Sequence, residues 1–280
     1  MNPNPGPAPT IVYMNTPPIA FVIAGSEATG GAGIQVDLKT FQQLGVYGVG
    51  ALSCIVAFDP ANNWGHRFHP VDPQIITEQF EAALATHPVE SMDTAKVGML
   101  GTPQTIDTVA GKLSERSWRN LVVDPVLICK GQEPGAALDT DNALREKILP
   151  LATVVTPNVF ESRTLSGMES ITTVGDLEEA ARRIGEHVPY VLAKGGVELP
   201  GDEAVDVLWD GQSITRFSAP KIGEQRVSGA GCTIAAALTA ELAKGTDIVE
   251  AVQRSKELVT RGIEHRVTAN TPFDTVWQGA

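Results

Sequence analysis

Short apolar segments alternate along the chain with longer stretches in which apolar residues recur every three or four positions. Residues 19–24 (IAFVIA) form a continuous apolar run of strand length, and residues 34–44 then show helical spacing and stop at Gly45. The alternation continues to a last helix expected at residues 248–266. Strands that alternate with helices are typical of a parallel sheet with crossover helices. The pattern therefore predicts an α/β fold of three layers with a mostly parallel central sheet.

The remaining expected elements follow the same rule. Strands are expected at residues 50–57, 94–100, 121–126, 153–156 and 190–194, helices at 73–86, 102–114, 141–149, 173–184 and 230–244, and a hairpin at 204–209 and 213–217. The Asp210-Gly211 pair supports that hairpin, because this dipeptide suits a tight turn between strands. Residues 130–141 are polar and rich in glycine, which leaves a surface loop and a mobile lid as equal alternatives.

The two ends of the chain differ in character. Residues 1–18 are rich in proline, lack the basic start and apolar centre of a signal peptide, and are expected to form a flexible tail. Residues 19–280 contain no repeat, long linker or change of composition, so a single domain is expected there. The expected location is the cytoplasm.

Composition and charge narrow the class of partner. Apolar residues make up 42% of the chain and charged residues 19%, which is a globular balance. A net charge of −12 and an aromatic content of 5% argue against nucleic acid, and no apolar run is long enough to span a bilayer. Three separated cysteines (Cys54, Cys129 and Cys232) without a CxxC pair argue against a disulfide scaffold or a zinc site. Small molecules remain as the expected partners.

The strongest local signal is the sequence SGAGCT at residues 228–233, which opens an alanine-rich helix. The backbone of Gly229, Ala230 and Gly231 can approach a ligand closely, and N–H groups at a helix start bind anions. Such donors stabilise a transferred phosphoryl group. The same positive field should lower the pKa of the Cys232 thiol. The alternative, that Cys232 is a small buried residue of the first helical turn, stays open on this evidence.

The first glycine-rich loop, GSEATGGAG at residues 25–33, is neither a Walker A motif nor a dinucleotide-binding fingerprint. Its glycines, hydroxyls and carboxylate favour a backbone that approaches a small polar ligand over a simple strand-to-helix turn. We therefore expect Gly25, Ser26, Glu27 and Gly31 to bind the substrate.

Polar residues also follow three later strands, at the sheet edge where α/β proteins bind ligands. Asn158 and Glu161 are candidate Mg²⁺ ligands, with an ordinary helix start as the alternative. Asp124 is expected either to support the metal or lid hinge or to cap a turn. Lys194 and Gly195 are expected to touch the phosphates of ATP, with a solvated lysine as the alternative.

Several blocks in the same order resemble one family. They are IAGSEATGGAGIQVDLKTFQQLGVYG, VVDPVLICKG, TPNVFESRTLSGM, VLAKGG, AVDVLWDG and SGAGCTIAAALTAELAKG, and they span residues 19–265. The chain resembles the hydroxymethylpyrimidine (phosphate) kinases and the related pyridoxal kinases of the ribokinase-like superfamily. The resemblance implies a ribokinase-like fold, a homodimer, and transfer of the ATP γ-phosphate, with Mg²⁺, to a hydroxymethyl group on an aromatic heterocycle. Cys232 stands where most ribokinase relatives carry an aspartate base.

Two features make the chain similar to the two-cysteine pyridoxal kinases of Gram-positive bacteria. Phe58 occupies the place of a glutamine that reads the aminopyrimidine edge in pyrimidine kinases, and a missing polar partner costs about 1–3 kcal/mol. Cys129 stands where the pyridoxal kinases carry a second cysteine. The resemblance implies that Cys232 holds the aldehyde of pyridoxal as a hemithioacetal while Cys129 assists proton transfer from the lid.

Two positions depart from the family pattern. Ser228 replaces a histidine, and a serine hydroxyl can form hydrogen bonds but cannot act as a base near neutral pH. Glu27 replaces an aspartate and keeps its charge. The resulting hypothesis is phosphorylation of the 5′-hydroxyl of pyridoxal. A hydroxymethylpyrimidine kinase of thiamine synthesis and a non-catalytic protein that binds vitamin B6 are the alternatives.

Overall fold

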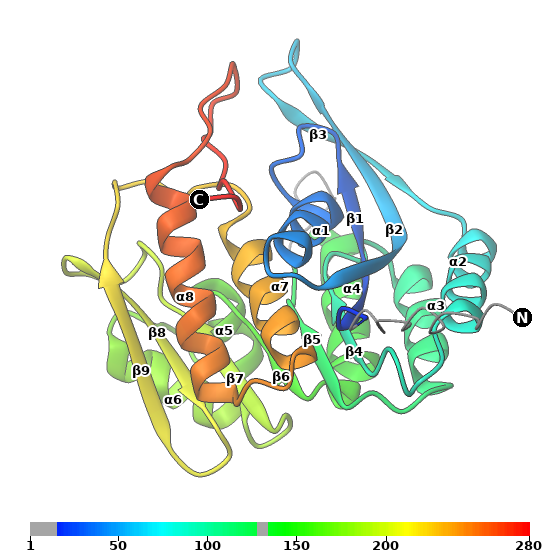
Figure 1. Cartoon of the computed structure of the whole chain (residues 1–280). Coiled ribbons are helices and arrows are strands. Elements are labelled where there is room, and N and C mark those ends of the chain that lie inside the picture. The colour runs from blue at the N-terminus through cyan, green and yellow to red at the C-terminus, as the bar shows by residue number, and fades with distance from the viewer. Residues whose placement is uncertain (1–15, 128–133) are drawn as a thin grey trace, which may run out of the picture.

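The structure, a computed structural model, describes residues 16–127 and 134–280 (Figure 1). Residues 1–15 of the expected tail and Cys129 lie outside the described residues. No described helix is long and apolar enough to cross a bilayer.

A single sheet of nine described strands organises the molecule (Figure 1). The spatial order of the strands is β3-β2-β1-β4-β5-β6-β7-β8-β9. Their bounds are β1 Ile19–Glu27, β2 Tyr47–Asp59, β3 Gly65–Pro70, β4 Thr94–Val97, β5 Asn120–Val123, β6 Val154–Val155, β7 Tyr190–Lys194, β8 Glu203–Trp209 and β9 Ile214–Pro220. The pairs from β2 to β7 are parallel, while β3 at one end of the sheet and β8 and β9 at the other end are added in antiparallel pairs. The predicted mostly parallel sheet is confirmed.

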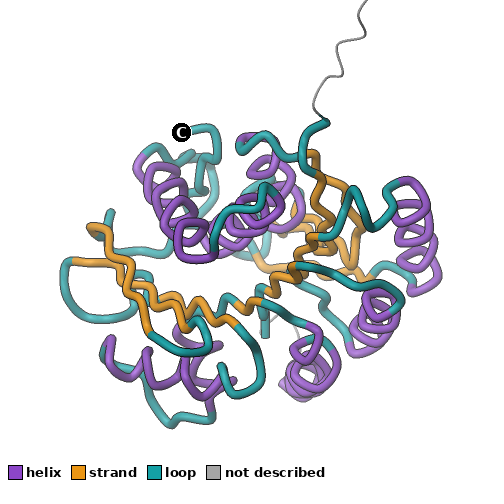
Figure 2. The backbone as a smooth tube through the Cα atoms, turned by 60° about the horizontal axis from the view of Figure 1, so that its bottom comes forward, coloured by secondary structure: helices purple, strands orange, loops and turns teal. Residues whose placement is uncertain are grey.

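Helices cover both faces of the sheet (Figure 2). One face carries α1 (Gly33–Gln43), α7 (Ala230–Ala243) and α8 (Ile248–Glu264). The other carries α2 (Pro73–Thr86), α3 (Pro103–Ser114), α4 (Pro134–Lys147), α5 (Val159–Ser166) and α6 (Val174–Ile184), with a short 3₁₀ turn at Leu149–Leu151. The three predicted layers are therefore present.

Strand β1 shows why its sequence reads as an unbroken apolar run. Phe21 and Ile23 pack into the core beneath α2 and α3, whereas Ala20 and Val22 pack toward α1 and α7. A strand that is covered on both faces needs apolar residues at every position. Helix α7 is buried along most of its length for the same reason, since it lies between the sheet and the two helices α1 and α8.

Two parts of the structure differ from the expectations. Helix α4 begins at Pro134, so the loop expected up to residue 141 is wrong from residue 134 onward, and proline is well suited to the first turn of a helix. Strand β3 (GHRFHP) was not predicted because its sequence lacks apolar alternation, and it pairs along the edge of β2 where few side chains are buried.

The parallel strands end at one edge of the sheet and bring polar residues together there. Strand β1 ends at Glu27, β5 ends one residue before Asp124, and β7 ends at Lys194. Helices α1 and α7 begin at the same edge, where their first residues, Gly33 and Ala230, lie within the two glycine-rich segments. Ligands of open α/β sheets bind at this edge.

Candidate active site

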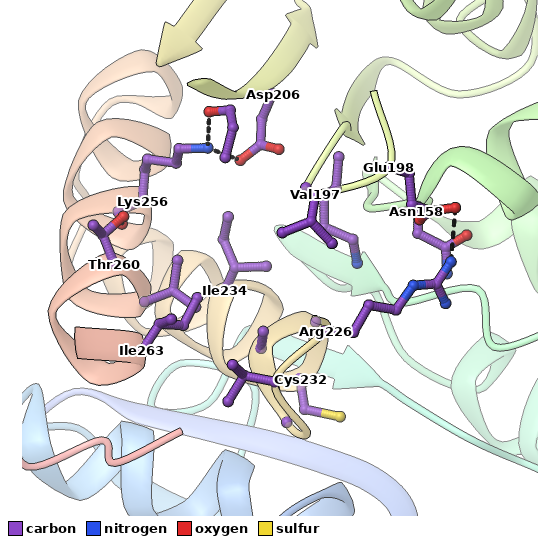
Figure 3. A pocket seen from close by; sticks show the side chains of 18 of the residues that line it. Asn158, Val197, Glu198, Asp206, Arg226, Cys232, Ile234, Lys256, Thr260 and Ile263 are labelled. Atoms are coloured by element: carbon purple, nitrogen blue, oxygen red, sulfur yellow. Dashed lines mark hydrogen bonds and ion pairs between the residues drawn. The ribbon is translucent and has the colours of Figure 1, made fainter. Parts of the chain in front are cut away.

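A cavity of about 750 Å³ opens at this edge (Figure 3). Cys232 lies at one end of it, and Lys256 and Asp206 lie at the other. Between them, Ile234 of α7 and Ile263 of α8 form an apolar wall. A cavity of this volume, mostly apolar with charged groups at both ends, suits a small molecule with a polar reacting group.

The second glycine-rich loop forms the Cys232 end of this cavity. Gly229 has a φ of 79° and caps α7, and a Cβ atom there would lie 2.2 Å from the carbonyl oxygen of Gly31. Ala230 and Gly231 follow in the first turn of α7 and also line the cavity. The N–H groups of Gly231 and Cys232 donate to no described residue. The expected helix start is confirmed, and its donors are free to bind an anion.

Two helix N-termini converge on Cys232. Its sulfur lies in the first turn of α7 and also accepts a hydrogen bond from the N–H of Gly33, the first residue of α1. Nevertheless, burial raises the pKa of the Cys232 thiol to about 11, and the nearby ammonium of Lys96 offsets only part of that rise. The expectation of a lowered thiol pKa is therefore wrong for this structure, because loss of hydration outweighs the helix field.

Lys194 and Asp124 form a buried ion pair beside this helix start. The Nζ atom of Lys194 lies 2.9 Å from Oδ1 of Asp124, which also accepts a hydrogen bond from Thr156. Burial disfavours the ammonium, but the charge of Asp124 raises the pKa of Lys194. The alternative of a solvated lysine is wrong. A Cβ atom on Gly231 would lie 3.5 Å from this Nζ, so the ammonium is adjacent to the free N–H groups.

Gly195 lies beneath the cavity wall. Its N–H donates to Oδ1 of Asp206 and to the carbonyl of Val205, and the neighbouring Gly196 is the residue that lines the cavity. A contact between Gly195 and ATP stays a prediction.

Asn158 and Glu161 form a capping box at the start of α5. The Asn158 side chain accepts from the N–H of Glu161, and one Glu161 carboxylate oxygen accepts from the N–H of Asn158. The helix-start alternative is thus correct as local structure, yet both residues also line the cavity. Burial raises the pKa of Glu161 to about 8, although Lys194 opposes the rise. No group of three or more histidine, cysteine or acidic residues in the described chain could hold a metal.

Glu27 organises the first glycine-rich loop from within. Its carboxylate accepts hydrogen bonds from the N–H and hydroxyl of Thr29 and from the N–H of Gly31. Ser26 accepts a hydrogen bond from Gln35. Gly25 is packed so closely that a Cβ atom would lie 2.6 Å from the sulfur of Cys54. Gly25, Ser26 and Glu27 are thus the last three residues of β1, and Glu27 holds Gly31 of the following loop beside them. Direct contact of these residues with a substrate stays a prediction.

Phe58, near the end of β2, belongs to an aromatic cluster. Its ring centroid lies 4.5 Å from that of His66 and 5.2 Å from that of Phe273, a residue of the C-terminal segment. The same segment pairs with Ser228, whose N–H donates to the carbonyl of Asp274 and whose carbonyl accepts from Val276. Ser228 is thus held by its backbone, and its hydroxyl lies 3.5 Å from the carbonyl oxygen of Gly31.

Comparison with known proteins identifies the family. Residues 27–277 match the family model described as phosphomethylpyrimidine kinase. The chain belongs to this family.

Within the phosphomethylpyrimidine kinase family, the chain is 44% identical over 252 residues to a pyridoxine kinase of Bacillus subtilis, covering 90% of this chain and 92% of the relative. The pyridoxal kinase of Staphylococcus aureus in complex with AMP-PCP and pyridoxal superimposes with a TM-score of 0.86 at 36% identity, covering 95% and 94% of the two chains. A phosphomethylpyrimidine kinase of Clostridium difficile gives a TM-score of 0.74 at 33% identity, covering 88% and 99%.

Two buried lysine–aspartate pairs near the family's cavity were missed from the sequence. Lys96 of β4 pairs with Asp37 of α1, and Lys256 of α8 pairs with Asp206 of β8. A signal for the first pair was present, because Lys96 interrupts an otherwise uncharged strand and a lysine is almost never fully buried unless it is paired. Its partner, Asp37, lies 59 residues away in the chain and could not be predicted from the sequence of the strand.

Proposed function

We propose that this protein is an ATP-dependent pyridoxal kinase that phosphorylates the 5′-hydroxymethyl group to give pyridoxal 5′-phosphate. One observation carries the proposal: the Cys232 thiol lies at the end of a cavity of about 750 Å³, beside N–H groups of a helix start that donate to none of the residues the structure describes. A nucleophile that touches an anion-binding site suits a substrate that carries both an aldehyde and a hydroxyl to be phosphorylated. The pyridoxine and pyridoxal kinases among the relatives support this choice.

In this proposal the phosphoryl group is transferred over the start of α7. The backbone of Gly229, Ala230 and Gly231 would hold it, because donors fixed before the reaction stabilise the charge that develops on the oxygens. Lys194 would neutralise the phosphates of ATP, with Asp124 holding its ammonium in place. Gly195 would position the adjacent Gly196 in the cavity wall.

The donor set also fits Mg²⁺, which prefers a few carboxylate and amide oxygens together with phosphate oxygens and water. Glu161 is a buried carboxylate that lines the cavity within the electrostatic reach of Lys194 and Asp124, and Asn158 lies beside it. These two residues would hold the ion, which would neutralise negative charge on the phosphates. A bound cation would also favour the ionised form of Glu161.

The choice of substrate would depend on the two cysteines and on the first glycine-rich loop. Cys232 would engage the pyridoxal aldehyde, Cys129 would assist proton transfer, and the loop held by Glu27 would carry Gly25, Ser26 and Gly31 against the ring. Phe58 offers an aromatic face where a pyrimidine kinase needs an amide. A homodimer is the assembly we expect, and sedimentation velocity would test it.

Steady-state assays with pyridoxal, pyridoxine and hydroxymethylpyrimidine test the proposal. We expect kcat/KM to be highest for pyridoxal. Turnover of hydroxymethylpyrimidine far above that of pyridoxal would indicate a pyrimidine kinase instead, and binding of pyridoxal without turnover would indicate a B6-binding protein. The variants C232A and C129A give the second test. We expect both to lose pyridoxal turnover, with the larger loss in C232A, and full activity in C232A would exclude the role of this thiol.

A further inference from the structure

Lys96 and Asp37 form the most deeply buried ion pair of the described chain. The Nζ atom of Lys96 lies 2.8 Å and 2.9 Å from the two oxygens of Asp37, and the side chains are 1% and 0% exposed. Both charges have lost their hydration, and apolar residues of similar size in such places are often equally stable or more so. Stability alone therefore does not account for a charged pair at this position.

The pair lies close enough to the cysteine end of the cavity for both of its charges to act on the Cys232 thiol. Asp37 follows Gly33 by four residues, so the two lie about one turn apart on α1. Gly33 donates its N–H to the sulfur of Cys232, and Asp37 holds the ammonium of Lys96. Strand β4, which carries Lys96, packs against α7, which carries Cys232. One turn of α1 thus connects the thiol to the buried lysine.

Four charged groups from four parts of the fold interact electrostatically with Cys232. They are Lys96 from β4, Asp37 from α1, Asp124 from the end of β5 and Lys194 from β7. Burial raises the pKa of the thiol most strongly; among the charges, Lys96 lowers that pKa, while Asp37 and Asp124 raise it. Lys194 forms its ion pair with Asp124. Lys96 therefore exerts the strongest attraction on a negative charge at the sulfur, and its influence exceeds that of Asp37.

We propose that Lys96, held in place by Asp37, is a positioning residue that stabilises the thiolate of Cys232 for addition to the aldehyde of the substrate. In that step the sulfur bonds to the aldehyde carbon, the π electron pair of the carbonyl moves to its oxygen, and this oxygen takes up a proton in place of the one that the thiol lost. The aldehyde rests on the proposed function, whereas the effect of Lys96 on the thiol does not require kinase activity.

The decisive experiment compares K96M with D37N. Alkylation of Cys232 by iodoacetamide is followed from pH 6 to pH 10 by mass spectrometry of the peptide that contains it, which separates this cysteine from Cys54 and Cys129. We expect K96M to slow alkylation at a given pH by about tenfold or more, because loss of a nearby opposite charge shifts a pKa by about one unit or more. We expect D37N to accelerate it, because Lys96 then acts without its counterion.

The opposite signs separate this proposal from a packing effect. Either substitution leaves an unpaired buried charge, so mere disruption of the fold would change alkylation in the same direction in both variants. The double variant K96M/D37N removes both charges, so it can replace a single variant that does not fold in the alkylation experiment. It should react more slowly than the wild type. An unchanged rate in K96M or in the double variant, or shifts of one sign in K96M and D37N, would overturn the proposal.

A second readout connects the thiol to the reaction. Pyridoxine has an alcohol in place of the aldehyde, so its phosphorylation needs no bond to sulfur. We expect K96M to lower kcat/KM for pyridoxal at least about tenfold more than for pyridoxine. Equal losses on both substrates would refute a role in aldehyde addition. If the wild type phosphorylates neither compound, the proposed function fails, and the alkylation experiment still decides whether Lys96 controls the thiol.

Discussion

The two glycine-rich loops of this protein look alike in sequence and differ in what they do with their N–H groups. Each loop leads into a helix, the first into α1 and the second into α7, and both helices lie on the same face of the sheet. In the first loop, Glu27 accepts from the N–H groups of Thr29 and Gly31. In the second, the N–H groups of Gly231 and Cys232 have no partner among the described residues.

This difference assigns separate tasks to the loops. A loop whose donors bind its own carboxylate is a rigid surface, whereas a helix start with free donors is a site for an outside anion. The loops nevertheless touch, since Gly229 packs against the carbonyl of Gly31 and Gly33 donates to Cys232. The first loop thus also supports the anion-binding start of α7.

The largest expected effect comes from separating the two loops. In G229A the new Cβ would collide with the carbonyl of Gly31, so we expect kcat/KM to fall about 100-fold, as displacements of about 1 Å near a reacting centre do. G245A is the matched control, because Gly245 has a similar φ of 83° and nothing within 4 Å of its Cβ position. In G245A, thermal unfolding should show that the free energy of unfolding falls by about 1 kcal/mol, while steady-state kinetics should show unchanged activity. Equal activity in the two variants would contradict the contact's importance.

Replacing Lys194, whose ammonium lies beside the N–H groups at the start of α7, should have the next largest effect. We expect K194M to weaken ATP binding about 10- to 100-fold, as loss of a charged hydrogen bond of about 1.5–3 kcal/mol implies. Isothermal titration with a non-hydrolysable ATP analogue would measure it. K147M removes a solvent-exposed lysine that pairs with Asp107 and should leave the affinity unchanged. An unchanged affinity in K194M would place the phosphates elsewhere.

Weakening the internal cap of the first loop should have a moderate effect. E27Q retains the size of the side chain but gives up one of the two acceptor oxygens that hold Thr29 and Gly31. Each weakened hydrogen bond should cost about 1 kcal/mol, so we expect KM for pyridoxal to rise about tenfold. KM for ATP should change little. Substitution of the exposed Glu169 by glutamine is the control. If only KM for ATP changed, the first loop would bind ATP rather than pyridoxal.

The smallest expected effect concerns the hydroxyl between the loops. The Ser228 hydroxyl lies 3.5 Å from its acceptor, at the long limit of a hydrogen bond, and its position depends on backbone pairing with the C-terminal segment. S228A should therefore change kcat/KM less than about threefold, since a good neutral hydrogen bond contributes only about 0.5–1.5 kcal/mol. A loss of more than tenfold would show that the hydroxyl takes part in the reaction.

Much of this architecture could be predicted from local pattern. The apolar run predicted the strand at residues 19–24, which in the structure extends to Glu27, and the helix expected at residues 230–244 is found at Ala230–Ala243. The early start of α4 could not, because its glycine and polar residues resemble a loop and the helix becomes stable only when it packs against α3. Strand β3 was hidden for a similar reason, since an exposed edge strand needs no apolar alternation.

The sequence by itself determined the alternation of strands and helices, the presence of two glycine-rich helix starts, and the set of polar residues at the strand ends. These depend on neighbouring residues, whose spacing is visible in the chain. Only the tertiary structure decided that Glu27 binds its own loop, that Lys194 and Lys96 are paired, and that burial raises the pKa of Cys232. Each of these depends on groups far apart in the chain and on exclusion of water, which only folding brings about.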